Sequence, residues 1–229
     1  MNQFGWLLQV GAQVDCVLRR YIDEGLVQVL PWHRLGVVSQ KEIRTEGIFA
    51  SLNDCLYRNR YDSALVLFID FDELVIPRQK WTLVDTIASL NTTTSKTAAY
   101  YFRNAFFYLQ WPDDATSSRQ KDEPSLTTLR KTRRNVKLHP HRIRSKFICQ
   151  PRRVVEVGNH FVWEFRSGST SHHVSESVAI MHHYRNCEFG GDSCLANPST
   201  EDRTALKYRQ PLVRAVRHRL DSWTHSCGL

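Results

Sequence analysis

Three carboxylates follow directly on an apolar run of six residues. The run is Ala64–Ile69, and Asp70, Asp72 and Glu73 come after it with Phe71 between the two aspartates. In an extended backbone Asp70 and Asp72 project to the same side, because successive side chains alternate. Adjacent carboxylates repel each other unless a proton or cation intervenes, and their hard oxygens suit Mn²⁺ or Mg²⁺. We therefore predict a divalent-metal site able to hold a diphosphate; the alternative is a solvated turn.

The elements that position these acids are predicted to form an α/β fold. Apolar spacing predicts a helix from Val14 that ends near Gly25, a short strand at Leu26–Leu30 and a second helix over about Lys41–Arg60. The run Ala64–Ile69 is apolar throughout, which is typical of a central parallel strand covered by helices on both faces. In open α/β sheets ligands bind beyond the carboxyl ends of strands, where the three acids lie.

The second half of the chain favours strands. A polar helix interrupted by Pro211 is expected over Glu201–Leu220. No internal repeat or linker is visible, so we predict one α/β domain over residues 1–229, with a mixed sheet flanked by helices and an antiparallel C-terminal half. The aromatic, extended stretches are Ala98–Gln110, Lys146–Gln150, Val154–Phe165 and Val178–His183.

Basic residues outnumber acidic ones, and one segment carries the excess. The chain has 31 Lys and Arg against 23 Asp and Glu, and ten of the basic residues lie between Arg130 and Arg153 without an acid among them. Such a run is typical of a solvated face, but it also motivates an alternative function, a nucleic-acid-binding module. The acids at Asp70–Glu73 and the lack of a nucleic-acid-binding signature argue against that alternative. No apolar run approaches the ~20 residues of a membrane span.

The segment Asp70–Arg78 resembles the D-x-D-E-F-hydrophobic-x-P segment of the family 92 glycosyltransferases. The resemblance extends over about residues 14–187 and implies a GT-A fold. It also implies transfer of a hexose, galactose in studied members, from a UDP-sugar to a glycan, with Mn²⁺ bridging enzyme and diphosphate in the Golgi lumen or at its membrane. The other matching segments are Tyr21–Val27, Leu52–Arg58, Arg144–Ile148, Val157–His160 and His182–Cys187.

The resemblance implies a set of metal ligands. The aspartates of the family motif fall on Asp70 and Asp72, and the His-Tyr-Arg segment near the end of the match suggests His183 as a further ligand. Since His182 and His183 face opposite ways on a strand, only one of them can join the site. His160 either belongs to the same site or caps the end of a strand.

Other roles are also implied by matching segments. Lys146 and Arg185 are expected to contact phosphate oxygens, for which an ammonium and a planar guanidinium are both suited.

Transfer with inversion needs a carboxylate near the acceptor hydroxyl as general base. The aromatic side chains of Trp111 and Trp163 either stack on a sugar or belong to the core. The candidate bases are Asp113, Asp114, Glu188 and Asp192.

The N-terminus departs from the family pattern. Family members begin with a strand that helps to hold the nucleotide, and Met1–Trp6 does not resemble it. We therefore expect the first nucleotide-binding strand, the stem and the membrane anchor to be missing from a shortened chain, so a catalytically inactive relative is a third hypothesis. Asn91–Thr93 is a glycosylation pattern. The six cysteines fit disulfides in the Golgi lumen, where Cys55, Cys149 and Cys187 lie in matching segments, or free thiols.

Overall fold

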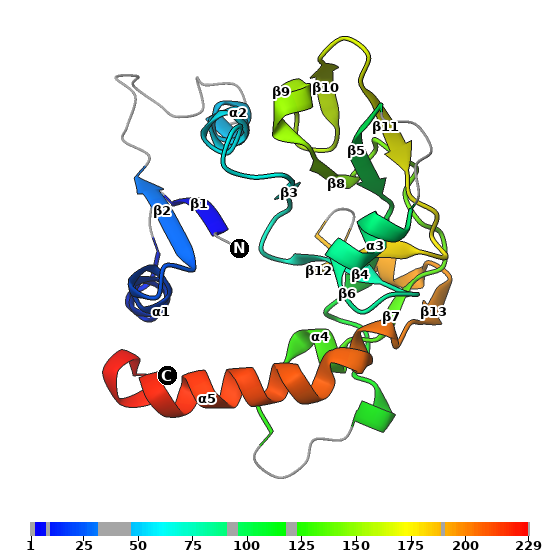
Figure 1. Cartoon of the computed structure of the whole chain (residues 1–229). Coiled ribbons are helices and arrows are strands. Elements are labelled where there is room, and N and C mark those ends of the chain that lie inside the picture. The colour runs from blue at the N-terminus through cyan, green and yellow to red at the C-terminus, as the bar shows by residue number, and fades with distance from the viewer. Residues whose placement is uncertain are drawn as a thin grey trace. The chain divides into compact units, whose positions relative to one another are not determined.

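The computed structural model describes residues 3–7, 10–31, 47–90, 96–117, 123–188 and 191–228. They form two compact units, which are described one at a time: Met1–Ser51 with Gln210–Leu229, and Leu52–Arg209. Helices and strands occur in both units, so the predicted mixed α/β class is confirmed (Figure 1). The prediction of a single domain stays a prediction. The glycosylation pattern at Asn91–Thr93 lies outside the described residues.

The first unit begins with a strand, a helix and a second strand. β1 (Gln3–Leu7) runs parallel to β2 (Val27–Pro31), and α1 (Ala12–Asp23) connects them. The predicted end of the helix is confirmed, since Gly25 follows it with a positive φ of 69°. The expectation of a missing first strand is not confirmed, because β1 precedes α1 and pairs with β2 along its whole length.

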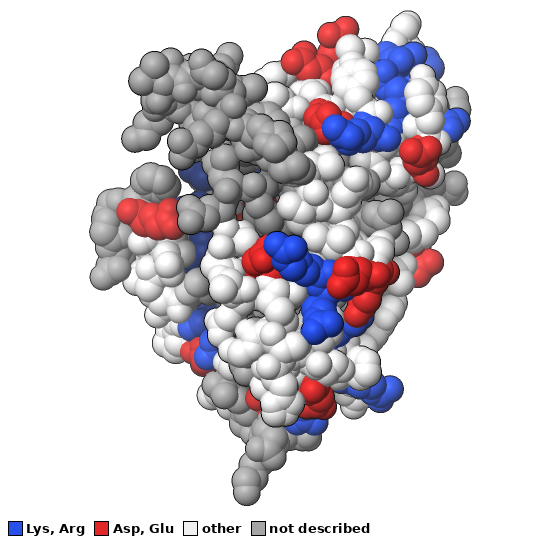
Figure 2. Space-filling model, turned by 90° about the vertical axis from the view of Figure 1, so that its left-hand side faces the viewer, with Lys and Arg blue, Asp and Glu red and all other residues white. Residues whose placement is uncertain are grey.

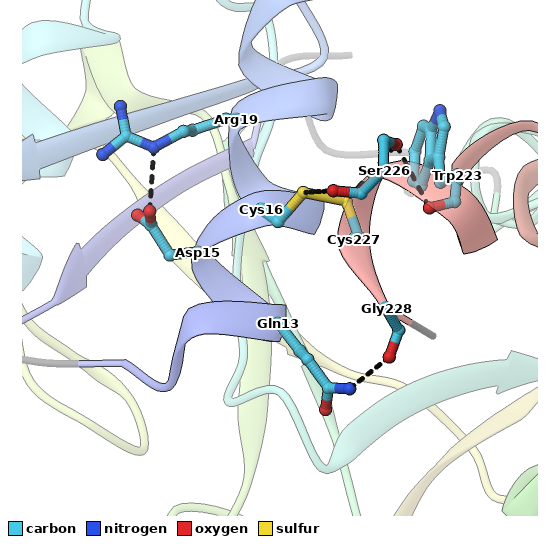
Figure 3. Close-up of a disulfide and its surroundings, with 8 residues drawn as sticks. All are labelled: Gln13, Asp15, Cys16, Arg19, Trp223, Ser226, Cys227 and Gly228. Atoms are coloured by element: carbon cyan, nitrogen blue, oxygen red, sulfur yellow. Dashed lines mark hydrogen bonds and ion pairs between the residues drawn. A yellow bond between two sulfur atoms is a disulfide. The ribbon is translucent and has the colours of Figure 1, made fainter.

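A disulfide joins the two ends of the chain in this unit. Cys16 of α1 is bonded to Cys227, the last residue of α5 (Arg209–Cys227), as Figure 3 shows. Close by, the rings of Tyr21 and Trp223 meet edge to face with their centres 4.9 Å apart. Covalent and aromatic contacts therefore hold α5 against α1.

The predicted C-terminal helix is displaced along the chain. It was expected over Glu201–Leu220 with a break at Pro211, whereas Glu201 ends β13 (Ser199–Glu201) and a 3-10 segment, η6 (Thr204–Tyr208), separates it from α5. Pro211 lies in the first turn of α5, where backbone N–H groups have no partner within the helix, so proline does not break it. Within the described ranges, no helix is both long and apolar enough to cross a membrane.

The helix expected over about Lys41–Arg60 is confirmed where the structure describes it. α2 spans Ile48–Arg58, while residues 41–46 lie outside the described ranges. Asn53 of α2 fixes it to β9 (Val154–Val157), because its side chain donates to the oxygen of Val157 at 2.8 Å and accepts from the nitrogen of Val157 at 2.9 Å.

The second unit contains a four-stranded sheet that corrects one prediction. The run Ala64–Ile69 is not a central parallel strand: only Val66–Phe68 forms a strand, and it pairs antiparallel with β8. Leu67 and Phe68 pack into different apolar clusters. The run is apolar throughout because both faces of the strand are covered, and this says nothing about whether the strand pairs in a parallel or an antiparallel direction. The strands in sheet order are β11 (Thr170–His173), β5 (Thr97–Phe102), β8 (Lys146–Cys149) and β3 (Val66–Phe68).

A three-stranded sheet begins immediately after the acidic turn. Its central strand β12 (Ala179–Arg185) runs antiparallel to β4 (Glu73–Pro77) and parallel to β6 (Asn104–Tyr108). In this register His183 lies opposite Glu73 on one side and Phe106 on the other. These three positions therefore form a row across the sheet.

The C-terminal half mixes both strand directions. Most pairs there are antiparallel, including the hairpin of β9 with β10 (Val162–Phe165) and the pair of β13 with β7 (Arg133–Asn135). The parallel pairs β11–β5 and β12–β6 correct the prediction of an antiparallel half. The remaining elements are α3 (Leu83–Ser89), η3 (Ala115–Ser117), α4 (Thr127–Arg130), η4 (Pro151–Arg153) and η5 (Gly191–Ala196).

A second disulfide joins Cys187 to Cys194. Cys187 is thus disulfide-bonded as expected, whereas Cys55 and Cys149 are free thiols. Both free thiols pack in the apolar cluster between α2 and the four-stranded sheet, where burial raises the pKa of each. Cys55 and Cys149 therefore act as apolar side chains of the core and not as disulfide partners.

Candidate active site

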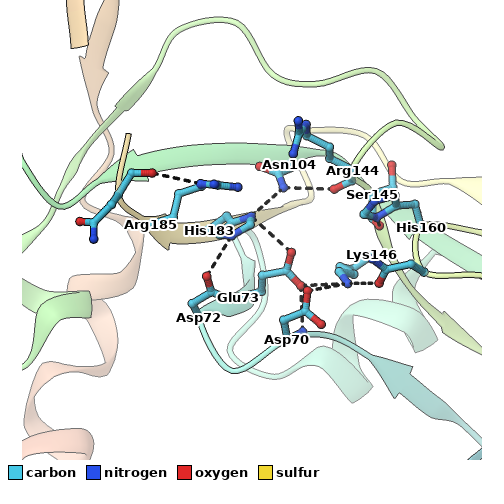
Figure 4. Close-up of polar contacts among 12 residues, drawn as sticks. Asp70, Asp72, Glu73, Asn104, Arg144, Ser145, Lys146, His160, His183 and Arg185 are labelled. Carbon is cyan, nitrogen blue, oxygen red and sulfur yellow. Dashed lines mark hydrogen bonds and ion pairs between the residues drawn. The ribbon is translucent and has the colours of Figure 1, made fainter. Parts of the chain in front are cut away.

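Two of the predicted metal ligands, Asp70 and Asp72, lie on the turn between β3 and β4. The backbone nitrogen of Glu73 donates to the oxygen of Asp70 at 3.1 Å, which closes the turn. The extended backbone expected here is therefore wrong, and the two aspartates contact different partners. Asp70 lies 3.0 Å from the Nζ of Lys146, and Asp72 lies 3.0 Å from the Nε2 of His183 (Figure 4).

Glu73 lies at the centre of this group of side chains. It is buried, with 2% of its side chain exposed, whereas Asp70 and Asp72 are half exposed. Its Oε2 accepts from the backbone nitrogen of Asp70 at 2.9 Å and lies 3.4 Å from the Nζ of Lys146, while its Oε1 lies 3.3 Å from the Nδ1 of His183. Burial raises the pKa of Glu73 to about 7, against the opposing effect of Lys146.

Lys146 is buried among acceptors. In addition to the two carboxylates, its Nζ donates to the Oδ1 of Asn159 at 2.7 Å. Asn159 lies in the turn between β9 and β10, so three segments meet at one ammonium group. The structure thus shows Lys146 paired with two carboxylates of the acidic turn, and its predicted contact with phosphate stays a prediction.

The two histidines of β12 face opposite ways, as expected. His182 is buried and stacks on Phe107 with ring centres 4.2 Å apart, whereas His183 faces Asp72. Burial lowers the pKa of His183, although Asp72 acts in the opposite direction, so the neutral imidazole is favoured. A neutral ring keeps a lone pair that can bind a metal ion.

His160 lies on the other side of the turn. Its Nδ1 is 3.3 Å from the oxygen of Ser145, and burial lowers its pKa, with the Lys146 charge acting in the same direction. The contact of His160 is thus separate from the contact between Asp72 and His183. The role of His160 as a metal ligand stays a prediction.

The side chains at the turn suit a divalent ion in part. An aspartate oxygen and an imidazole nitrogen are ligands that Mn²⁺ accepts, and Asp72 and His183 present one of each at 3.0 Å. In the part of the chain that the structure describes, there is no group of three or more His, Cys, Asp or Glu residues arranged to hold a metal. The protein therefore offers two ligands backed by Glu73, and a bound ion would need further ligands from substrate or water.

Arg185 extends the site along β12. It lies two residues after His183 and therefore on the same face of the strand. Its guanidinium donates to the Oε2 of Glu188 at 2.8 Å and lies 5.2 Å from the centre of the Phe106 ring. Glu188 is thus the predicted base candidate that the structure connects to the row of Glu73, His183 and Phe106.

The other base candidates have different surroundings. Asp113 forms ion pairs with Arg130 and Lys131, each at 2.7 Å, and the Lys131 contact lowers its pKa. Asp114 is held by Arg203 at 2.7 Å, which keeps the pKa of its carboxyl well below the usual range. Because their pKa values are lowered, Asp113 and Asp114 are weak bases. The side chain of Asp192 lies outside the described residues.

Sequence reasoning placed Glu73 at the site without giving it a role, and it did not assign Asn104, Arg144 or Asn159 to the site. Asn104 donates to the oxygen of Arg144 at 3.1 Å and lies 3.2 Å from the Nδ1 of His183. Its signal in the sequence is an amide in the middle of the aromatic stretch Ala98–Gln110. Of the two roles considered for Trp111, the structure shows the core one: the residue is only 7% exposed, and its indole nitrogen donates to the oxygen of Leu195.

Of the ten basic residues between Arg130 and Arg153, at least five form ion pairs with acids: Arg130, Lys131, Arg133, Arg134 and Lys146. Arg134, for example, contacts Asp202 at 2.9 Å, and Arg133 contacts Glu201 at 4.0 Å. Figure 2 shows blue and red side chains beside one another on the face that it presents. This arrangement does not favour a surface that binds a polyanion.

Comparisons with known proteins agree on one family. The family described as "Glycosyltransferase family 92" matches residues 6–220. Galactan beta-1,4-galactosyltransferase GALS2 of Arabidopsis thaliana is 27% identical over 188 residues, which are 76% of this chain and 34% of the relative. GALS3, with the same description and from the same plant, is also 27% identical, over 76% of this chain and 35% of its own.

A third relative comes from an animal. Glycosyltransferase family 92 protein F13G3.3 of Caenorhabditis elegans is 33% identical over 70 residues, which are 27% of this chain and 14% of the relative. The chain spans about a third of the length of the two plant relatives.

Proposed function

We propose that this chain, which belongs to glycosyltransferase family 92, transfers a hexose, with galactose the expected sugar, from a UDP-sugar to a glycan. The observation that carries the proposal is the pair of Asp72, immediately before β4, and His183 of β12, with the buried carboxylate of Glu73 next to the histidine. Two relatives that are named galactosyltransferases support the choice of galactose, and their names make a galactan the first acceptor to test.

In this proposal Asp72 and His183 hold Mn²⁺ or Mg²⁺. The ion, when bound, neutralises the negative charge that develops on the departing diphosphate. Glu73 holds the imidazole of His183 in place through Nδ1, which leaves Nε2 directed at the site. Lys146 keeps the acidic turn folded by neutralising Asp70 and Glu73.

Arg185 and Glu188 are assigned to the two substrates. The guanidinium of Arg185 binds phosphate oxygens, for which its planar fork is suited. Glu188, at 2.8 Å from Arg185, takes the proton of the acceptor hydroxyl as general base. Its side chain is 57% exposed, so an acceptor from solvent can reach it.

Titration calorimetry with Mn²⁺ and UDP tests the metal role. Asp72→Ala removes one of the two ligands, and we expect the Mn²⁺-dependent affinity for UDP to fall by about 10-fold or more, as for a lost charge-assisted contact. Asp54→Ala is the matched control, because Asp54 is an aspartate paired with Arg58 on α2 at 2.6 Å. Equal binding by wild type and Asp72→Ala would remove the metal from the proposal.

The other hypotheses predict different results. A nucleic-acid-binding module would bind RNA or DNA with an affinity that falls steeply with salt. A catalytically inactive relative would bind UDP-galactose without hydrolysing or transferring it, which a donor-hydrolysis assay detects. The two disulfides favour an oxidising compartment such as the Golgi lumen, where this family is expected.

A further inference from the structure

The loop before β8 holds two arginines in an unusual backbone conformation. Arg142 and Arg144 have positive φ angles of 68° and 56°, a region that residues with side chains rarely adopt. The loop is nevertheless fixed: the backbone nitrogen of Arg142 donates to the Oγ of Ser145 at 2.9 Å, and that of Ile143 to the oxygen of Pro140 at 3.2 Å. Backbone strain of this kind concentrates at binding and catalytic sites.

Arg144 is connected to His183 by two routes. Through its main chain, its oxygen accepts from the Nδ2 of Asn104 at 3.1 Å, and the same Nδ2 lies 3.2 Å from the Nδ1 of His183. Through its side chain, the guanidinium lies 5.5 Å from the centre of the Phe106 ring, whose centre is 5.2 Å from that of His183. Arg144 is therefore in contact with Asn104 and Phe106, which are both neighbours of His183 (Figure 4).

Phe106 carries a second guanidinium, that of Arg185, at 5.2 Å from its centre. Arg185 is paired with Glu188, whereas no ion pair joins Arg144 to an acid among the residues that the structure describes. Arg144 is exposed. Two guanidinium groups near one aromatic ring, next to the candidate metal ligands, suit a dianionic ligand by their charge.

We propose that Arg144 binds the diphosphate of the sugar-nucleotide donor, together with Arg185, beside Asp72 and His183. The inference rests on the proposed function and assigns to it a residue that the family motif does not single out. Phe106 holds the two guanidinium planes, so that their N–H groups meet phosphate oxygens. The two arginines of the loop lie over different rings, Arg144 at 5.5 Å from Phe106 and Arg142 at 4.3 Å from Phe161.

The test compares two matched variants, Arg144→Asn and Arg142→Asn. Both remove one exposed arginine with a positive φ from the same loop, and asparagine tolerates that backbone conformation. Calorimetry with UDP and UMP, each with Mn²⁺, measures the preference for the diphosphate, and melting temperatures report folding. We expect Arg144→Asn to weaken UDP binding about 10- to 100-fold and to reduce the UDP preference, since a charge-assisted hydrogen bond is lost.

The outcomes distinguish a failure of the role of Arg144 from a failure of the proposed function. Arg142→Asn is expected to bind UDP within about twofold of wild type, because its guanidinium lies on another ring. An equal loss in both variants, an Arg144→Asn protein that keeps the wild-type preference, or a wild type without such a preference overturns the role of Arg144. A wild type that does not bind UDP at all overturns the proposed function itself, and the role of Arg144 with it.

Discussion

Replacing Glu73 by glutamine separates the folding of the acidic turn from metal binding. Glu73→Gln keeps the shape of the side chain and removes its charge. Burial raises the pKa of Glu73 to about 7, so near neutral pH the neutral carboxyl and the carboxylate are close in free energy. Gln resembles the neutral form, whereas the Glu73 carboxyl of the unfolded chain is ionised at pH 7. We therefore expect the variant to unfold at pH 7 with a free energy equal to that of wild type or higher, by up to about 3 kcal/mol. Lys146 keeps Asp70 and Asn159 as partners in the variant.

Metal binding is expected to respond much more strongly. The Nδ1 of His183 lies 3.3 Å from the Oε1 of Glu73, and a carboxylate in that position orients the ring and makes its other nitrogen a better ligand. Loss of such a partner lowers metal affinity about 10- to 100-fold. We therefore expect Glu73→Gln to bind Mn²⁺ in the presence of UDP at least about 10-fold more weakly than wild type, measured by calorimetry beside urea unfolding of the same samples.

A second acidic substitution provides the control. Glu176→Gln also removes one carboxylate from an ion pair, with Arg103 at 2.6 Å, but Glu176 is 57% exposed. It is expected to leave both Mn²⁺ affinity and unfolding close to wild type. A Glu73→Gln protein that folds normally and binds Mn²⁺ as tightly as wild type would falsify the orienting role of Glu73.

Two further predictions concern stability. Although burial raises the pKa of Asp202, a hydrogen bond from Thr204 and the charges of Arg134 and Arg78 lower it to about 2, so its contribution to stability is present above about pH 4 and is lost as the pH falls through 2. The free energy of unfolding of Asp202→Asn should therefore be about 2 kcal/mol lower than that of wild type at pH 7, and this difference should shrink toward pH 2. Denaturant unfolding of both proteins at the two pH values measures it. A difference that is the same at both pH values contradicts the prediction. The disulfide of Cys16 with Cys227 closes a long loop, so Cys16→Ser is expected to lose about 2–4 kcal/mol of unfolding free energy, seen as a lower melting temperature. A reductant should lower the melting temperature of wild type more than that of the variant, because the variant has already lost this bond and can lose only the bond of Cys187 with Cys194.

The sequence predicts best what depends on local spacing. The helix that ends near Gly25, the described part of the second helix and the opposite orientation of His182 and His183 follow from periodicity and glycine conformation, and each is confirmed. The acidic turn is also placed correctly after the apolar run. The conformation of this segment is not predicted correctly, because the residues Asp70–Glu73 are compatible with both an extended strand and the backbone turn that the structure has at Asp70.

What the sequence cannot show is which partner each group meets. The apolar run around β3 packs on two faces, but its antiparallel partner β8 is about 80 residues later in the chain, and hydrophobicity carries no direction. Lys146 belongs to the basic run, yet burial beside Asp70 and Glu73 gives it a different environment from its neighbours. Only the register of β4 with β12 brings Glu73 to His183, across about 110 residues.

The charges at the turn give an independent reason to expect a cation there. Asp70, Asp72 and Glu73, when ionised, carry three negative charges against the one positive charge of Lys146, while burial favours the neutral form of His183. Two negative charges remain, and without a counter-charge the cost falls on the most buried member, which agrees with the raised pKa of Glu73. A divalent ion at Asp72 and His183 supplies the matching charge and favours the ionised form of Glu73 that orients the histidine. Metal binding and ionisation of Glu73 should therefore promote each other, so that Mn²⁺ uptake releases protons.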